Sequence, residues 1–111
     1  VRPIACHGGG SLPFLMGRFD RMWAISASRR DISQPPSTHL RRIFFDSIVY
    51  DQRTLEYLVA TVGADRVLYG SDYPFRLGDM AGLLGRVNAL APAERDAVRG
   101  LNAIREFKLK V

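Results

Sequence analysis

The sequence contains few cysteines and histidines, the residues that form disulfides and many metal sites, and it has no long apolar run. Its 111 residues include one cysteine, Cys6, and two histidines, His7 and His39. A single cysteine excludes an internal disulfide and suits a reducing compartment. No apolar run approaches the roughly 20 residues of a membrane helix, and residues 1–6 are too few for the apolar core of a signal peptide. We therefore expect a soluble, cytoplasmic protein with no membrane partner.

Acidic residues are scarce relative to basic ones. Lysine and arginine total 16 against 11 aspartates and glutamates, which gives a net charge of +5. Such a charge suits nucleic acid, an anionic substrate or the acidic surface of another protein. However, no strand alternates basic and aromatic residues, as base-stacking surfaces do. We expect no nucleic-acid partner, and the alternative of a basic nucleic-acid-binding module depends on charge alone.

The distribution of apolar residues predicts one small α/β domain over residues 1–111. With 47% hydrophobic and 24% charged residues, the chain can form a globular core. Predicted strands occupy residues 1–6, 42–46 and 67–70. Predicted helices occupy residues 14–27, 52–62, 80–90 and a final stretch that begins at Pro92. This alternation of strands and helices indicates a parallel sheet covered by helices.

Residues typical of helix ends support these boundaries. Ser11 and Asp51 are expected to cap the first and second helices, and Gly63 to end the second. The first helix has an aromatic-rich face, because its apolar residues recur at helical spacing. The expected inner face of the last helix consists of Val98, Leu101, Ile104 and Phe107. The polar stretch at residues 26–38, which includes Arg29, Arg30 and Asp31, is expected to be a surface loop.

Polar side chains follow each predicted strand. His7 comes directly after the first strand, Asp46 ends the second, and Asp72 follows the third. The loops at the carboxyl ends of parallel strands form the active face of strand–helix folds. His7 and Asp72 are therefore candidates for acid–base chemistry or metal binding. The structural alternatives are that His7 packs at a strand end and that Asp72 forms a turn.

Other polar residues give weaker indications of function. Arg18 and Arg21 lie three apart on the first helix, so they are either solvated surface residues or include a carboxylate-binding arginine, Arg18. His39 has no second ligand nearby in the sequence and is not a candidate. The three glycines after His7 lack the spacing of a phosphate-binding loop.

An ordered set of motifs resembles a known family. It consists of His7-Gly8-Gly9-Gly10, Pro13-Phe14, Gly17-Arg18, Phe45-Asp46, Gly63-Ala64-Asp65-Arg66-Val67, Gly70-Ser71-Asp72-Tyr73-Pro74-Phe75, and Gly100 with Asn102-Ala103. In order and spacing, the set resembles the C-terminal part of the amidohydrolase-related family. By motif it is most similar to the aminocarboxymuconate-semialdehyde decarboxylases.

This resemblance implies a fold, a cofactor and a reaction. The fold would be the C-terminal portion of a (β/α)8 barrel, with a divalent metal at its mouth that is usually zinc, and manganese as the alternative. Asp72 would ligate the metal, His7 would transfer protons, and Arg18 would bind a substrate carboxylate across a dimer interface. The implied reaction is non-oxidative decarboxylation of an unsaturated or aromatic carboxylate, with hydrolysis of a related substrate as the alternative.

The sequence also departs from the family pattern. The family's His-x-His pair and a further metal-binding histidine have no counterpart, and about three strand–helix units stand where a barrel needs eight. We therefore expect a segment that is inactive alone and that forms a homo-oligomer or associates with a missing barrel half. The alternative is a catalytically silent oligomeric domain, since the uncovered strand edges of a partial barrel favour self-association.

Overall fold

The computed structural model describes residues 2–26 and 32–111. Within these ranges, three parallel strands form one sheet in the order β1-β2-β3: β1 (Ile4–Ala5), β2 (Phe44–Asp46) and β3 (Val67–Leu68). The predicted parallel sheet is thus confirmed, but each strand is shorter than predicted. The strand predicted at residues 42–46 was expected to begin at Arg42, but Arg42 belongs to a preceding 3₁₀ helix. At β3, Tyr69 donates its N–H to the carbonyl of Val98 at 3.0 Å rather than to a neighbouring strand.

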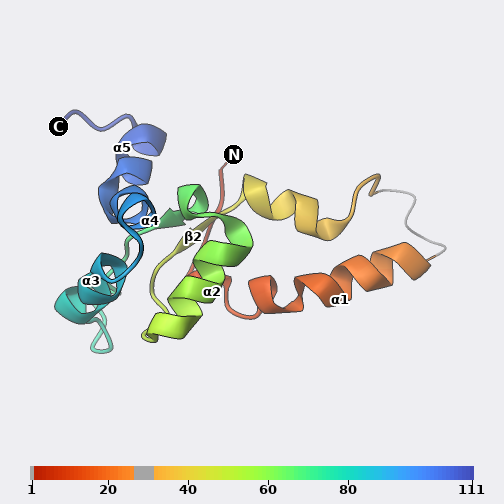
Figure 1. Ribbon diagram of the computed structural model, residues 1–111, viewed down its shortest axis with the longest axis horizontal. Coiled ribbons are helices and arrows are strands. Elements are labelled where there is room, and N and C mark those ends of the chain that lie inside the picture. The colour runs from red at the N-terminus through yellow and green to blue at the C-terminus, as the bar shows by residue number, and fades with distance from the viewer. Residues whose placement is uncertain (1, 27–31) are drawn as a thin grey trace.

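Helices connect and cover the strands (Figure 1). They are η1 (His7–Gly9), α1 (Leu12–Ile25), η3 (Pro36–Arg42), α2 (Gln52–Val62), η4 (Ala64–Arg66), α3 (Met80–Asn88), α4 (Pro92–Asp96), the π-helix η5 (Ala97–Leu101) and α5 (Asn102–Phe107). The alternation of strand and helix therefore follows the predicted order. None of the helices in the described ranges combines the length and apolar character needed to cross a bilayer.

The core lies between one face of the sheet and α2. Ala5, Phe45 and Val67 pair across the three strands and therefore share a face. This face packs against the buried side of α2, formed by Leu55, Leu58, Val59 and Val62. Two predicted boundaries of α2 are confirmed, because the Asp51 carboxylate accepts the N–H of Thr54 at 2.8 Å and Gly63 adopts a φ of 91°. The amphipathic helix thus covers this face of the sheet together with Val87, Leu90 and Val98 of the later segments.

Helices α1 and η3 extend side by side away from the sheet (Figure 1). The Asp20 carboxylate joins them by accepting the N–H of Ser37 at 2.9 Å. The aromatic-rich face of α1 is partly covered, because Phe14 is 77% exposed whereas Phe19 packs against the core beside the buried Met16. Ser11 also makes no side-chain capping bond, since its own backbone is helical. The end of the predicted loop belongs to η3, and residues 27–31 of that loop, which include Arg29, Arg30 and Asp31, lie outside the described ranges.

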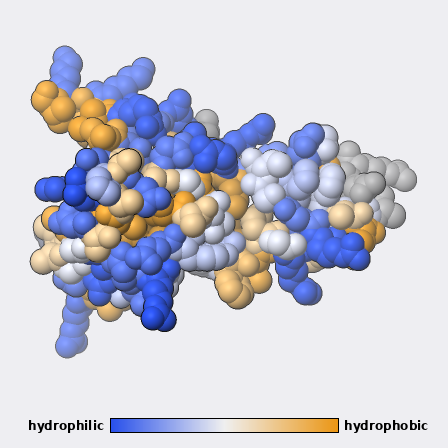
Figure 2. Space-filling view, in the orientation of Figure 1, coloured by the Kyte–Doolittle hydropathy of each residue, from blue (hydrophilic) through white to orange (hydrophobic). Residues whose placement is uncertain are grey.

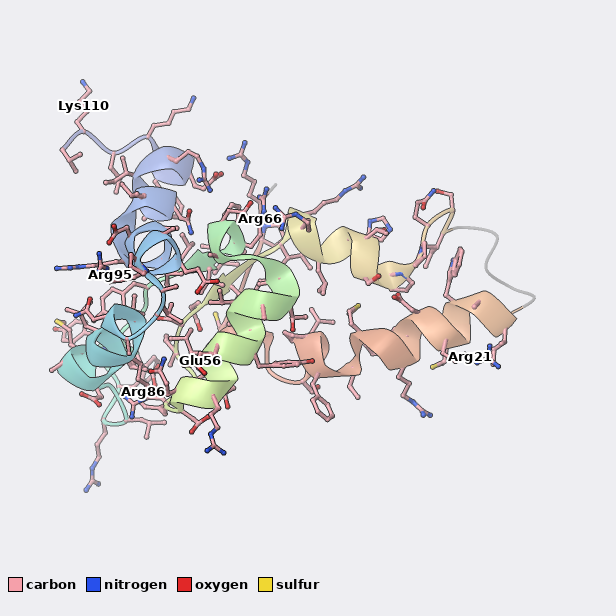
Figure 3. All side chains as sticks on the ribbon, in the orientation of Figure 1. Arg21, Glu56, Arg66, Arg86, Arg95 and Lys110 are labelled. Carbon is pink, nitrogen blue, oxygen red and sulfur yellow. The ribbon has the colours of Figure 1, made fainter. Side chains whose placement is uncertain are left out.

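The projecting pair of helices leaves apolar and basic groups at the surface. Figure 2 shows polar side chains over much of one face, with apolar patches over the beginning of α1 and near the C-terminus. Figure 3 shows Arg21 on the projecting helix, far from the sheet. Phe14 and Ile25 of α1 are exposed, as is Arg21.

The last helical segment differs from the predicted amphipathic helix. Val98 is buried as predicted, but Leu101 and Phe107 are more than half exposed, and Asn102 is fully buried. The cause is the π-helical turn at Ala97–Leu101, whose wider spacing brings Asn102 rather than Leu101 back to the face of Val98. The Asn102 amide donates to the carbonyls of Ala64 at 2.7 Å and Val67 at 2.8 Å.

Candidate active site

A left-handed turn after β1 positions His7. His7 has a φ of 54°, and Gly8 and Gly9 follow with φ of 62° and 79°. A Cβ on Gly8 would lie 2.5 Å from Val49 Cγ1, and one on Gly9 would lie 2.7 Å from the ring of Phe45. The glycines therefore allow the turn to lie directly against the β2 strand and the segment that follows it. As a result, His7 lies at the carboxyl end of the sheet, where the sequence predicted it.

Asp46 holds this turn in place from the neighbouring strand. Its Oδ2 accepts the N–H of His7 at 2.9 Å, and its Oδ1 accepts those of Gly8 at 2.9 Å and Ile48 at 3.0 Å. Its side chain is mostly buried. A carboxylate that accepts three backbone N–H groups is a fixed structural acceptor. Asp46 therefore positions His7, and its strand-end location does not make it a reacting group.

Asp72 reaches the same edge from the loop after β3. Asp72 Oδ1 lies 3.9 Å from His7 Nε2, a distance that permits an ion pair with the imidazolium but exceeds a hydrogen bond. The His7 side chain is 68% exposed, whereas that of Asp72 is only 10% exposed. The structure thus brings together the two residues that the sequence predicted. An accessible imidazole faces a largely buried carboxylate.

Tyr50 is a third residue of this site, and the sequence analysis missed it. Its hydroxyl lies 2.9 Å from Asp72 Oδ2 and 2.8 Å from the carbonyl oxygen of Leu77. Desolvation, the hydrogen bond to Asp72 and the negative charges of Asp72 and Asp79 raise the pKa of Tyr50 to about 12. The phenol therefore remains protonated at neutral pH and acts as a donor. Its position just before the helix cap Asp51, in the loop after β2, was the available signal.

These residues line a cavity of about 680 Å³. Its walls combine apolar and aromatic side chains with a few polar groups: Pro13, Phe14, Ile48, Val49, Tyr57, Leu58 and Leu77, together with His7, Tyr50, Arg53, Thr54 and Asp72. Such a lining suits a small, partly apolar ligand. Arg18 is exposed on α1 and does not line this cavity, whereas Arg53, which the sequence analysis did not single out, does.

The donors at this site suit a divalent metal in type but not in number. Carboxylate and imidazole both bind manganese or zinc. Among the described residues, however, no group of three or more histidine, cysteine, aspartate or glutamate side chains is close enough to hold a metal. Catalytic zinc generally takes about three protein ligands. Asp72 and His7 are therefore fewer donors than such a site takes.

The fold and site define a class of protein. A parallel sheet that presents histidine and aspartate at its carboxyl edge is the arrangement of (β/α)8-barrel enzymes, and three strands amount to a partial barrel. The family model for amidohydrolases matches residues 1–109, and the chain belongs to this family. The resemblance seen in the sequence is thus confirmed at the level of the family, and the predicted fold class is confirmed with it.

Known proteins similar to this chain include several decarboxylases. A 2-amino-3-carboxymuconate-6-semialdehyde decarboxylase of Dictyostelium discoideum is 30% identical over 102 residues, which cover 88% of this chain and 28% of that protein. A 2,6-dihydroxybenzoate decarboxylase, solved with 2,6-dihydroxybenzoate, is similar with a TM-score of 0.81 and 26% identity, over 97% of this chain and 35% of that one.

A third similarity concerns the fold alone. A dihydroxybenzoic acid decarboxylase of Polaromonas sp. JS666, solved with manganese and 2-nitroresorcinol, has a TM-score of 0.82 at 23% identity, over 97% of this chain and 34% of that chain. The chain therefore spans about a third of the length of these relatives.

Proposed function

We propose that residues 1–111 form a single partial-barrel segment, the C-terminal portion of a metal-dependent, non-oxidative decarboxylase. The observation that carries this proposal is the convergence of His7 and Asp72, 3.9 Å apart, from the ends of β1 and β3 onto one cavity. Similarity to decarboxylases of unsaturated and aromatic acids supports the reaction. The substrate would be a small unsaturated or aromatic carboxylate, whose apolar body suits the walls of the cavity.

In this proposal Asp72 is a metal ligand, and further ligands come from barrel strands outside these residues. Manganese and zinc both accept carboxylate and imidazole donors. The Polaromonas structure, which is similar in fold, was solved with manganese, and zinc rests on the resemblance described above. When bound, a divalent metal polarises substrate oxygens as a Lewis acid. Asp72 would present its Oδ1 to the ion, because Oδ2 is engaged by Tyr50.

His7 would supply the proton that decarboxylation requires. When the bond between the substrate carbon and its carboxylate breaks, CO2 leaves and the electron pair stays on that carbon. The carbon then takes a proton, for which His7 Nε2 is the available donor, and no oxidant is needed. The exposure of the His7 side chain, 68%, leaves it accessible to substrate. The Asp46 carboxylate keeps the backbone of His7 in place during this transfer.

Arg18 would bind the substrate carboxylate from a second copy of the chain. Its exposed position on α1, outside the cavity, requires that it act across an interface. Arginine suits this role because its guanidinium matches a carboxylate bidentately. A homo-oligomer is therefore part of the proposal, and a cytoplasmic location suits the free thiol of Cys6.

The test is elemental analysis for manganese and zinc together with an assay for CO2 release from 2,6-dihydroxybenzoate. In a barrel completed by the strands that lie outside these residues, we expect near-stoichiometric metal and its loss in Asp72→Ala. His7→Ala should retain metal and lose CO2 release. The matched control is Asp96→Ala, because Asp96 pairs with Arg95 at the surface and removing it changes the charge equally. Metal content that is the same in Asp72→Ala and wild type would refute the proposed ligand.

A further inference from the structure

The cavity at the carboxyl edge of the sheet has an apolar wall that is open to solvent. Phe14 of α1, Tyr57 of α2 and Leu77 line it, and they are 77%, 46% and 69% exposed. The Tyr57 hydroxyl donates to the carbonyl of Pro13 at 3.3 Å, so α2 and the first turn of α1 are joined at this wall. Exposed apolar side chains around a cavity of about 680 Å³ are typical of a site for a small molecule with an apolar body.

Arg53 gives this cavity a positive charge. It lies on the first turn of α2, and its side chain is exposed and lines the cavity. Among the described residues, no carboxylate lies within ion-pair distance of its guanidinium. Asp51, two residues before it, accepts the N–H and the hydroxyl of Thr54 at 2.8 and 2.9 Å instead. Arg53 is therefore available to pair with an anion that enters the cavity.

The other charged groups of the cavity are engaged with their neighbours. Asp72 Oδ2 accepts the hydroxyl of Tyr50 at 2.9 Å, and its Oδ1 lies 3.9 Å from His7 Nε2. Of the described residues that line the cavity, Arg53 is thus the one that carries a permanent charge without a counter-ion. A guanidinium binds a carboxylate through two parallel hydrogen bonds. The cavity therefore combines an apolar wall with a group that recognises carboxylates.

We infer that Arg53 is a specificity-determining residue, which binds an anionic substituent of a small aromatic or unsaturated acid inside this cavity. The inference rests on the proposed function for the class of ligand, and it adds a recognition group from the same chain as His7 and Asp72. Arg18 lies outside the cavity and would need a second copy to reach the ligand, whereas Arg53 needs none. Every residue that carries the inference lies within the described ranges, so neither a metal nor further barrel strands enter it.

The test is ligand binding by the purified chain in the presence of EDTA, so that no metal contributes. Benzoate and benzamide, its neutral analogue of the same shape, are titrated separately and followed through the backbone amide resonances of ¹⁵N-labelled protein. In wild type we expect benzoate to bind about fivefold more tightly than benzamide, which is the upper range for a solvated ion pair. The resonances that shift should be those of cavity residues such as Gly8, Thr54 and Tyr57.

Variants of Arg53 separate its charge from its shape. Arg53→Gln should lower benzoate affinity about fivefold, close to that of benzamide, and should leave benzamide affinity within about twofold of wild type. Arg53→Lys keeps the charge but loses the planar fork, so we expect it to restore part of the loss. The matched control is Arg99→Gln, which removes an exposed arginine of η5 outside the cavity and changes the net charge equally. The control should bind benzoate as wild type does.

Several outcomes would overturn the inference. They are equal affinity of the wild type for benzoate and benzamide, and the absence of benzoate binding. Equal losses in Arg99→Gln and Arg53→Gln would also overturn it, because attraction to the net charge would then account for binding. A loss in Arg18→Gln but not in Arg53→Gln would assign the carboxylate to Arg18 instead.

The binding test is independent of the test of the proposed function. Benzoate binding that depends on Arg53, together with no CO2 release by the completed barrel, would refute the decarboxylation and support the role of Arg53. CO2 release together with benzoate binding that is unchanged in Arg53→Gln would refute the role of Arg53 alone.

Discussion

Replacement of Asp46 by asparagine tests whether this carboxylate holds the turn that carries His7. Asparagine has nearly the same shape but only one acceptor oxygen. If that oxygen keeps the N–H groups of Gly8 and Ile48, the amide nitrogen faces the N–H of His7, and two donors oppose each other. A lost hydrogen bond to a charged acceptor costs about 2 kcal/mol. If the asparagine oxygen instead keeps the N–H of His7, the hydrogen bonds from Gly8 and Ile48 are both lost. The loss of one bond, about 2 kcal/mol, is therefore the smaller destabilisation of the two orientations.

The assay is urea unfolding of the purified protein, monitored by circular dichroism. With a typical slope for a chain of this size, about 2 kcal/mol corresponds to a midpoint lowered by about 1 M. The matched control is Asp51→Asn, which removes the same charge from a helix cap where asparagine serves as well as aspartate. We expect the control to unfold near the wild-type midpoint. Equal shifts of the urea midpoint in Asp46→Asn and Asp51→Asn would refute the geometric reasoning, because loss of charge alone would then account for the effect.

Two further predictions concern the first turn and the second helix. Gly8→Ala should destabilise the protein by about 1–3 kcal/mol, because a new Cβ would lie 2.5 Å from Val49 Cγ1; an unfolding midpoint equal to that of the wild type would contradict this. The backbone N–H and then the hydroxyl of Thr54 lower the pKa of Asp51, so its capping contribution is complete above the ordinary carboxyl pKa and is lost as pH falls through the lowered pKa. The difference in urea midpoint between wild type and Asp51→Ala should therefore be smaller at about pH 2 than at about pH 7, and a constant difference would count against it.

The sequence predicted those features that depend on local chemistry. Hydrophobic periodicity predicted the alternation of strands and helices, and the capping role of Asp51 followed from its short acceptor side chain. The rule that functional groups follow parallel strands predicted that His7 and Asp72 meet, which they do at 3.9 Å. Residue roles beyond this proximity, including the binding of substrate by Arg18, remain predictions.

Features that depend on contacts distant in sequence were not predictable. Tyr50 reaches Asp72 only because its backbone is left-handed and because β2 and β3 are adjacent. The residues next to Tyr50 in the sequence indicate neither fact. The π-helical turn likewise removed Leu101 from the predicted inner face and placed Asn102 there, since one wider turn changes the face of every later residue. The predicted strands were too long because apolar residues beside a strand can pair with a helix instead, as Tyr69 does.

The contacts of the final helices limit where this chain can be divided. The Asn102 amide donates to the carbonyls of Ala64 and Val67, and the Val98 carbonyl accepts the N–H of Tyr69. Removal of the residues after α4 would therefore leave both ends of β3 without their partners. The loop that carries Asp72 would lose its anchor, although no residue of the site had been deleted. Any attempt to reassemble a barrel from separate pieces should keep Val67 to Phe107 on one polypeptide.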